Sequence, residues 1–217
     1  MKILISQPKM EKSLQQLIVE LESFPEVDIF LFPEGYFTAD YIEEVCNLAK
    51  KHHTYIVTGY KDDNKKDKVF IANRSGKIIL ERAKTPENKA LYTPSKIKDE
   101  NCSLGFLLCR EIFQGLEGLE NGNAEIIFNP IGVGMFSEEQ YEEWTNEARK
   151  IAISENAFVV GASHADGSYR NCGFSIPIAY CFDQEGNDLL LSKNDIRTRI
   201  FDTETKSIKI AEKIKEC

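Results

Sequence analysis

Three apolar segments of the chain are each followed by a side chain that could take part in covalent chemistry. Glu34 comes two residues after the first segment, Lys84 four residues after the second, and Cys109 directly after the third. Catalytic side chains of α/β folds tend to lie where strands end and loops begin. If the three ends converge, a thiol, a carboxylate base and a cation meet in one pocket. That combination suits attack by sulfur on a carbonyl carbon, because the reactive thiolate needs a base nearby.

Each of these residues also has an ordinary structural explanation. A cysteine after an apolar run is most often an inert core residue. One glutamate among 35 acidic residues is unremarkable, and a lysine in a polar loop is by default solvated. The order glutamate, lysine, cysteine therefore has little specificity by itself, and the interpretation depends on the sequence around each residue.

The segments that would position these residues alternate between helical and extended patterns. Apolar residues at helical spacing predict helices over 11–23 and 39–51. Buried strands are predicted at 3–6, 28–32 and 54–60. The first part of the chain is thus expected to alternate strand and helix.

The middle of the chain has weaker patterns. A hairpin is predicted over 69–80, because the turn residues 73–76 separate two short apolar runs. The segment 83–101 lacks a clean period and is predicted to be a loop. A short helix is expected over 112–120, closed by Gly122.

The longest helix is predicted over 137–156, with Ser137 as N-cap and acidic residues in its first turn. Further strands are expected at 104–108, 126–128 and 157–163, followed by a strand-rich tail. Because the hairpins lie between crossover helices, the pattern favours one α/β domain, 1–217, with a mixed rather than purely parallel sheet.

Composition excludes several classes of protein. The 217 residues include 35 acidic and 27 basic side chains, and without a long basic block this argues against binding nucleic acid. No segment approaches the roughly 18 consecutive apolar residues of a membrane span, and the N-terminus lacks a secretory signal pattern. Six cysteines without CxxC pairs or metal-ligand spacing indicate reduced thiols. We expect a cytoplasmic protein with no structural metal and no membrane association.

The sequence around the three candidate residues resembles the nitrilase superfamily of carbon–nitrogen hydrolases. The segment Leu31–Tyr36 (LFPEGY) is similar to that family's catalytic glutamate motif, and Lys84 falls where its catalytic lysine is expected. Cys109 ends a Gly-Phe-Leu-Leu run, as the family's nucleophile does. The resemblance continues in order over nearly the whole chain, through Ala124–Pro130, Trp144–Ala162, Gly173–Ser175 and Asp183–Gly186.

This resemblance implies a fold, a mechanism and a class of substrate. The fold would be a four-layer α-β-β-α sandwich with mixed sheets. Glu34 would be the general base, Lys84 the oxyanion stabiliser and Cys109 the nucleophile that forms a thioester. The substrate would be a small linear amide or an N-carbamoyl compound, and the reaction would need no cofactor. Family members usually pair, so a homodimer or higher homo-oligomer is implied.

The chain departs from the family pattern at several positions. Pro86 and Glu87 stand where the family usually has a His-Leu pair, and Arg110 and Glu111 stand where an aromatic residue and an aspartate usually follow the cysteine. The segments between the three candidate residues are also shorter than is typical. These departures leave the triad intact and leave the identity of the substrate open.

Three more residues are candidates for contact with the substrate. Glu87 is the nearest match to a second glutamate that positions substrate in many family members, with a plain loop carboxylate as the alternative. The backbone N–H of Arg110 would join Lys84 in holding the oxyanion. His164 ends a predicted strand and could line the pocket.

Two other functions stay open at the level of sequence. The thioester could pass to an amine instead of water, which would make the protein an N-acyltransferase. Alternatively, a catalytically silent member could have kept the fold in order to bind a partner.

Overall fold

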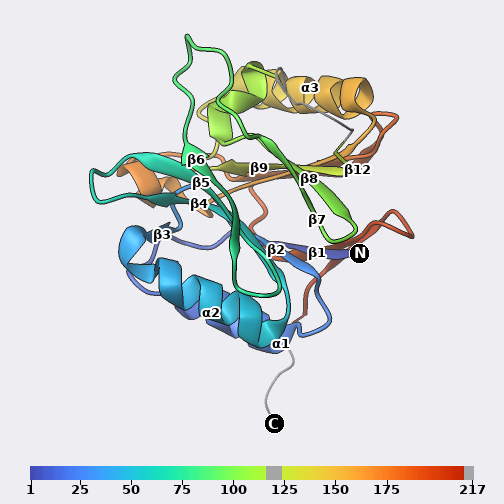
Figure 1. Cartoon of the computed structure of the whole chain (residues 1–217). Coiled ribbons are helices and arrows are strands. Elements are labelled where there is room, and N and C mark those ends of the chain that lie inside the picture. Colours follow the sequence, from blue (N-terminus) through green and yellow to red (C-terminus); the bar gives the residue numbers. More distant parts are fainter. Residues whose placement is uncertain (116–123, 213–217) are drawn as a thin grey trace.

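Two β-sheets form the centre of the protein, whose computed structural model describes residues 1–115 and 124–212 (Figure 1). The first sheet consists of β1 (Lys2–Ile5), β2 (Ile29–Leu31), β3 (Phe37–Thr38), β4 (Tyr55–Lys61), β5 (Asp67–Ala72), β6 (Ile78–Ala83), β13 (Arg199–Asp202) and β14 (Ser207–Ile210). Its order is β14-β13-β1-β2-β4-β5-β6, with β3 paired to β4. The pairs β1·β2 and β2·β4 are parallel and the hairpin β5·β6 is antiparallel, so this sheet is mixed.

The second sheet consists of β7 (Lys96–Asp99), β8 (Cys102–Phe106), β9 (Ile126–Ile131), β10 (Phe158–Ser163), β11 (Ile178–Phe182) and β12 (Asp188–Lys193). Its order is β12-β11-β10-β9-β8-β7. The strands β8, β9 and β10 run parallel, and antiparallel strands flank them on both sides. The second sheet is therefore also mixed.

Helices cover the outer faces of both sheets. The helices α1 (Gln15–Ser23) and α2 (Ile42–His52) lie on the first sheet, and α3 (Glu138–Glu155) lies on the second (Figure 1). Short 3-10 turns occur at η1 (Ala39–Tyr41), η2 (Cys109–Phe113) and η3 (Gly167–Arg170). The Ser137 side chain accepts a hydrogen bond from the Gln140 N–H and Asn156 ends α3 in a left-handed conformation, so the predicted helix and its N-cap are confirmed.

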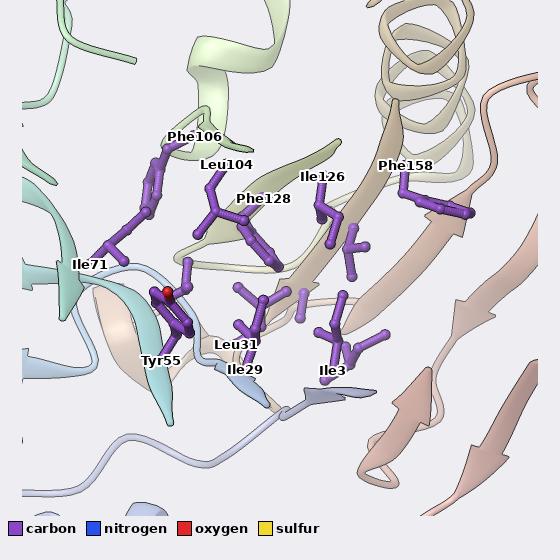
Figure 2. Packing of buried hydrophobic residues seen from close by; sticks show 14 of the residues in the cluster. Ile3, Ile29, Leu31, Tyr55, Ile71, Leu104, Phe106, Ile126, Phe128 and Phe158 are labelled. Atoms are coloured by element: carbon purple, nitrogen blue, oxygen red, sulfur yellow. The ribbon is translucent and has the colours of Figure 1, made fainter. Parts of the chain in front are cut away.

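The largest apolar core lies between the two sheets. Residues from the inner faces of both sheets meet there, including Ile3, Leu31 and Tyr55 from the first sheet and Phe106 and Phe128 from the second (Figure 2). Separate clusters fill the space between each sheet and its helices. The structure thus confirms the predicted four-layer α-β-β-α sandwich with mixed sheets.

Some boundaries differ from the sequence-based predictions. The first helix begins at Gln15 rather than Glu11. Glu11 lies before the helix, and its carboxylate accepts hydrogen bonds from the Gln16 N–H in the first turn and from the Tyr36 hydroxyl. The predicted loop 83–101 contains β7, an edge strand whose sequence KIKD has no apolar run to mark it.

Two predictions for the segments around Cys109 also differ from the structure. The strand expected at 104–108 is β8, which begins and ends two residues earlier. The helix predicted over 112–120 is present only as η2, up to Phe113, and the part of that prediction from 116 to Gly122 lies outside the described residues.

No helix within the described ranges is both long and apolar enough to cross a membrane.

Candidate active site

Glu34 lies in a tight turn that follows β2. The β2 strand continues through the Phe32 N–H, which donates to Val57 O, and Pro33 then ends the ladder. The Thr58 hydroxyl donates to Pro33 O at 2.7 Å and holds the turn against β4. The Glu34 side chain is completely buried as a result.

Lys84 directly follows β6, whose carboxyl end lies at the same end of the first sheet as that of β2. Its backbone N–H donates to Asp67 O, which extends the pairing of β6 with β5 by one residue. Its Nζ donates to Glu34 Oε1 at 2.5 Å. Glu34 Oε2 has no nitrogen or hydroxyl donor among the described residues, and the Cys109 thiol is close enough to this carboxylate to influence its proton.

Cys109 comes three residues after the end of β8 in the second sheet, and its backbone has a positive φ of 54°. Such a conformation is unfavourable for a residue with a side chain and persists only where the surroundings hold it. Asn129 on β9 provides that support, because its Nδ2 donates to Leu107 O at 2.6 Å and to Cys109 O at 3.0 Å. Trp144 and Tyr180 donate in turn to Asn129 Oδ1, so the amide that holds the turn is itself fixed.

The three side chains influence one another's protonation. Burial raises the pKa of Glu34 above its usual value, although Lys84 opposes the shift, so this carboxylate is a stronger base than an exposed glutamate. Burial and then the Glu34 charge raise the pKa of Cys109 to about 12, while Lys84 and a hydrogen bond from the Gly132 backbone lower it. Burial acts to lower the pKa of Lys84, but the charges of Cys109 and Glu34 outweigh it and the pKa lies above its usual value. The Cys109 thiol is therefore harder to ionise than a free thiol, and the Lys84 ammonium lies against the Glu34 carboxyl group.

Tyr169 and Gly132 form a wall of the same site. A Cβ added at Gly132 would lie 2.6 Å from Glu34 Oε2 and 2.4 Å from the Tyr169 ring, so only glycine fits there. The Tyr169 hydroxyl donates to Asp67 Oδ1 at 2.6 Å, and Lys61 Nζ donates to the same oxygen at 2.9 Å. These bonds fix the ring over the backbone that carries the candidate base.

Solved structures of other proteins share this architecture. No family model matches the sequence, and no curated protein matches it. A CN-hydrolase superfamily protein from Xanthomonas campestris, with an arsenic adduct in its active site, aligns with a TM-score of 0.71 at 11% identity, over 94% of this chain and 91% of that chain. A carbon–nitrogen hydrolase from Helicobacter pylori aligns with a TM-score of 0.67 at 16% identity, over 95% and 90% of the two chains.

The chain has the nitrilase-type carbon–nitrogen hydrolase fold. The resemblance inferred from the sequence is thereby confirmed at the level of the fold. A third match is an amidase from Nesterenkonia in which a glutamate has been replaced by glutamine and the active-site cysteine carries the acetamide moiety of fluoroacetamide. That structure aligns with a TM-score of 0.64 at 13% identity, over 92% of this chain and 89% of the amidase.

Within the nitrilase-type fold, the other predicted site residues lie at different depths. Glu87 and Arg110 are both exposed and form an ion pair with each other at 2.7 Å, and only Arg110 is adjacent to Cys109 in the chain. His164 is completely buried, and its Nε2 lies 3.0 Å from the backbone oxygen of Glu34. Burial lowers the pKa of His164, so a neutral imidazole packs behind the base. The roles of these three residues in binding substrate stay predictions.

Four residues that the sequence analysis did not propose for the site support its geometry. Asn129 and Gly132 belong to a strand end whose turn pattern was recognised, but their contacts with Cys109 and Glu34 cross between elements. Arg82 and Glu111 form a buried ion pair beside Lys84 and Cys109. The one available signal was that Glu111 stands where the family usually has an aspartate. No cluster of three or more potential metal ligands occurs in residues 1–115 or 124–212.

Proposed function

We propose that this protein is a hydrolase that cleaves the carbon–nitrogen bond of a small linear amide or N-carbamoyl compound through a thioester on Cys109. The observation that carries the proposal is the buried Lys84–Glu34 ion pair next to a cysteine held in a left-handed turn. A base, a cation and a thiol in one buried site are the parts that nucleophilic acyl transfer requires.

The reaction begins with proton transfer. Glu34 Oε2 takes the proton from the Cys109 thiol, and its raised pKa favours this role. The thiolate attacks the amide carbon, and the electrons of the C=O bond move to oxygen. Lys84 Nζ and the Arg110 backbone N–H hold the oxyanion, and loss of one such donor typically costs about 100- to 1,000-fold in rate.

The second half of the reaction returns the enzyme to its starting state. The tetrahedral intermediate collapses, the C–N bond breaks, and ammonia or an amine leaves with the proton from Glu34. Glu34 then takes a proton from water, and the hydroxide attacks the thioester. The acid departs, and the proton returns to the Cys109 sulfur. The amidase from Nesterenkonia, whose active-site cysteine carries an adduct, supports a nucleophilic cysteine in this fold.

An ammonia-release screen tests the proposal. A panel of small aliphatic amides, ω-amides and N-carbamoyl compounds is incubated with the wild-type protein and with Cys109→Ala as the blank. We expect at least one compound to release ammonia with the wild type alone. Release by neither protein, or by both equally, would contradict the proposed function. Hydroxylamine added during turnover separates hydrolysis from acyl transfer, because a thioester passed to the amine gives a hydroxamate and a thioester passed to water gives the acid.

We further propose that the protein acts in the cytoplasm as a homodimer. Its cysteines lack disulfide spacing, and the exposed Ile153 on α3 is an apolar side chain that pairing could cover. Sedimentation of the purified protein tests the dimer, and a single species at 24.7 kDa would contradict it.

A further inference from the structure

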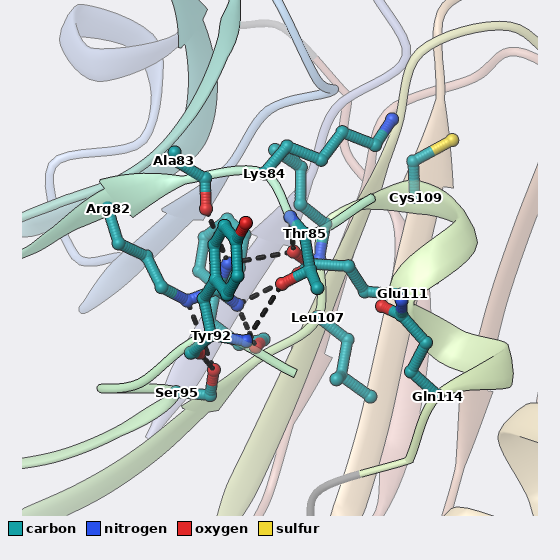
Figure 3. Close-up of polar contacts among 12 residues, drawn as sticks. Arg82, Ala83, Lys84, Thr85, Tyr92, Ser95, Leu107, Cys109, Glu111 and Gln114 are labelled. Carbon is teal, nitrogen blue, oxygen red and sulfur yellow. Dashed lines mark hydrogen bonds and ion pairs between the residues drawn. The ribbon is translucent and has the colours of Figure 1, made fainter. Parts of the chain in front are cut away.

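One buried carboxylate, that of Glu111, accepts four hydrogen bonds from both sheets. Its Oε1 accepts from Arg82 Nη1 at 2.7 Å and from the Thr85 N–H at 2.6 Å. Its Oε2 accepts from Arg82 Nη2 at 2.8 Å and from the Leu108 N–H at 2.7 Å. Each oxygen therefore takes one guanidinium proton and one backbone proton (Figure 3).

The two backbone donors flank two members of the proposed triad. Thr85 directly follows Lys84, at the end of the first sheet. Leu108 directly precedes Cys109, two residues after β8 of the second sheet ends. In Figure 3 the Lys84 ammonium and the Cys109 sulfur extend to the same side of this cluster. One carboxylate thus ties the backbone of the lysine to the backbone of the cysteine.

The guanidinium of Arg82 also donates hydrogen bonds to other acceptors besides Glu111. Its Nε donates to Pro94 O at 3.0 Å and to Ser95 Oγ at 3.1 Å, and its Nη1 also donates to Ala83 O at 3.0 Å. The side chains of Arg82 and Glu111 are 5% and 0% exposed. The pair is therefore a fixed and fully hydrogen-bonded support rather than a surface contact.

Stability alone does not account for this ion pair. Removing two charges from water costs several kcal/mol for each ion, and a buried pair is often replaceable by apolar residues without loss of stability. What an apolar replacement cannot supply is the pair of bonds to the Thr85 and Leu108 N–H groups. Those bonds fix the relative position of two segments that come from different sheets.

We propose that Glu111 is a positioning residue that sets the distance between Lys84 and Cys109, with Arg82 holding its carboxylate in place. The inference rests on the proposed function for its kinetic consequence, but not for its effect on the thiol. A displacement of about 1 Å in such a site typically costs about 100-fold in rate. Lys84 lowers the pKa of Cys109, so moving the lysine away must also make the thiol harder to ionise.

The substitution Glu111→Gln tests the proposal with little change in size. A glutamine offers one acceptor oxygen and an NH₂ group, and the NH₂ cannot accept from the Thr85 or Leu108 N–H. We expect kcat to fall by about 100-fold with KM changed by less than about threefold. The pH profile of Cys109 alkylation by iodoacetamide, followed by peptide mass, should move to higher pH. Both are measured on protein whose circular dichroism matches the wild type.

The matched control is Glu147→Gln, which breaks the Lys150–Glu147 ion pair within α3, a pair that shares no residue with the Glu111 cluster. This control should keep the wild-type kcat and alkylation profile. If Glu111→Gln does not fold, Arg82→Lys replaces it, since it keeps the charge and loses the two-pronged contact. That variant should lower kcat by about 10-fold and shift the alkylation profile in the same direction.

An unchanged alkylation profile in folded Glu111→Gln or Arg82→Lys would overturn the positioning role. That readout does not depend on any amide substrate. If the wild type hydrolyses no amide but the profile shifts as expected, the proposed function fails and the positioning of Lys84 by Glu111 stands.

Discussion

The Nζ of Lys84 lies 2.5 Å from Oε1 of Glu34, although the strands that the two residues follow, β6 and β2, are separated by β5 and β4. The lysine therefore spans the end of the first sheet to reach the base. Cys109 approaches the same point from the second sheet. The site exists only where the two sheets are stacked.

Replacing Lys84 should change both the rate and the ionisation of the thiol. Burial and the Glu34 charge raise the pKa of Cys109 to about 12, and Lys84 opposes that rise, so Lys84→Met should move the pH profile of Cys109 alkylation to still higher pH. Loss of the oxyanion donor should lower kcat by about 100- to 1,000-fold. Lys89→Met, which changes an exposed lysine of the following loop, is the control. Identical profiles for the two variants would remove Lys84 from the electrostatics of the thiol.

Adding one methyl group at Gly132 should disable the site. The Cβ of Gly132→Ala would lie 2.4 Å from the Tyr169 ring and 2.6 Å from Glu34 Oε2, so the ring or the base must move. We expect kcat/KM to fall by about 100-fold while the protein stays folded. Gly173→Ala is the matched control, because nothing lies within 4 Å of its added Cβ. Full activity in Gly132→Ala would show that the wall does not constrain Glu34.

Loss of the Asn129 amide should destabilise the protein. Asn129→Ala leaves the Trp144 N–H, the Tyr180 hydroxyl and two carbonyl oxygens without their partner in a buried region. Each unsatisfied group costs about 1–3 kcal/mol, and partial relaxation reduces the sum, so we expect about 3 kcal/mol less unfolding free energy by urea titration.

The control for that measurement is Asn146→Ala, which removes only an exposed bond from Arg149 and should change stability by less than about 0.5 kcal/mol. If Asn129→Ala lowered the unfolding free energy by no more than this control does, the turn at Cys109 would be held by other contacts.

The layered fold and the three central residues could be predicted from the sequence. Glu34, Lys84 and Cys109 each follow an apolar run at a strand end, and strand ends in an α/β sandwich meet at one edge. The long helix could be predicted as well, because Ser137 and the acidic first turn are local signals.

The supporting contacts could not be predicted, because they join segments far apart in the chain. Glu111 bonds to Thr85 and Arg82, and Asn129 holds the turn at Cys109 from a neighbouring strand. Nothing in the local spacing of these polar residues distinguishes them from solvated ones. The edge strand β7 was missed for a related reason, since its register is set by pairing with β8 rather than by its own pattern.

The central claim is that Cys109 is the nucleophile, and the mass of the intact protein during turnover tests it most directly. The fastest amide from the ammonia screen is mixed with the wild type and with Cys109→Ala, the reactions are quenched in acid, and both proteins are weighed. We predict an added mass equal to the amide minus ammonia in the wild type, mapped to the peptide that contains Cys109, and no added mass in the variant. An adduct that persists in Cys109→Ala, or that maps to another residue, would contradict the account.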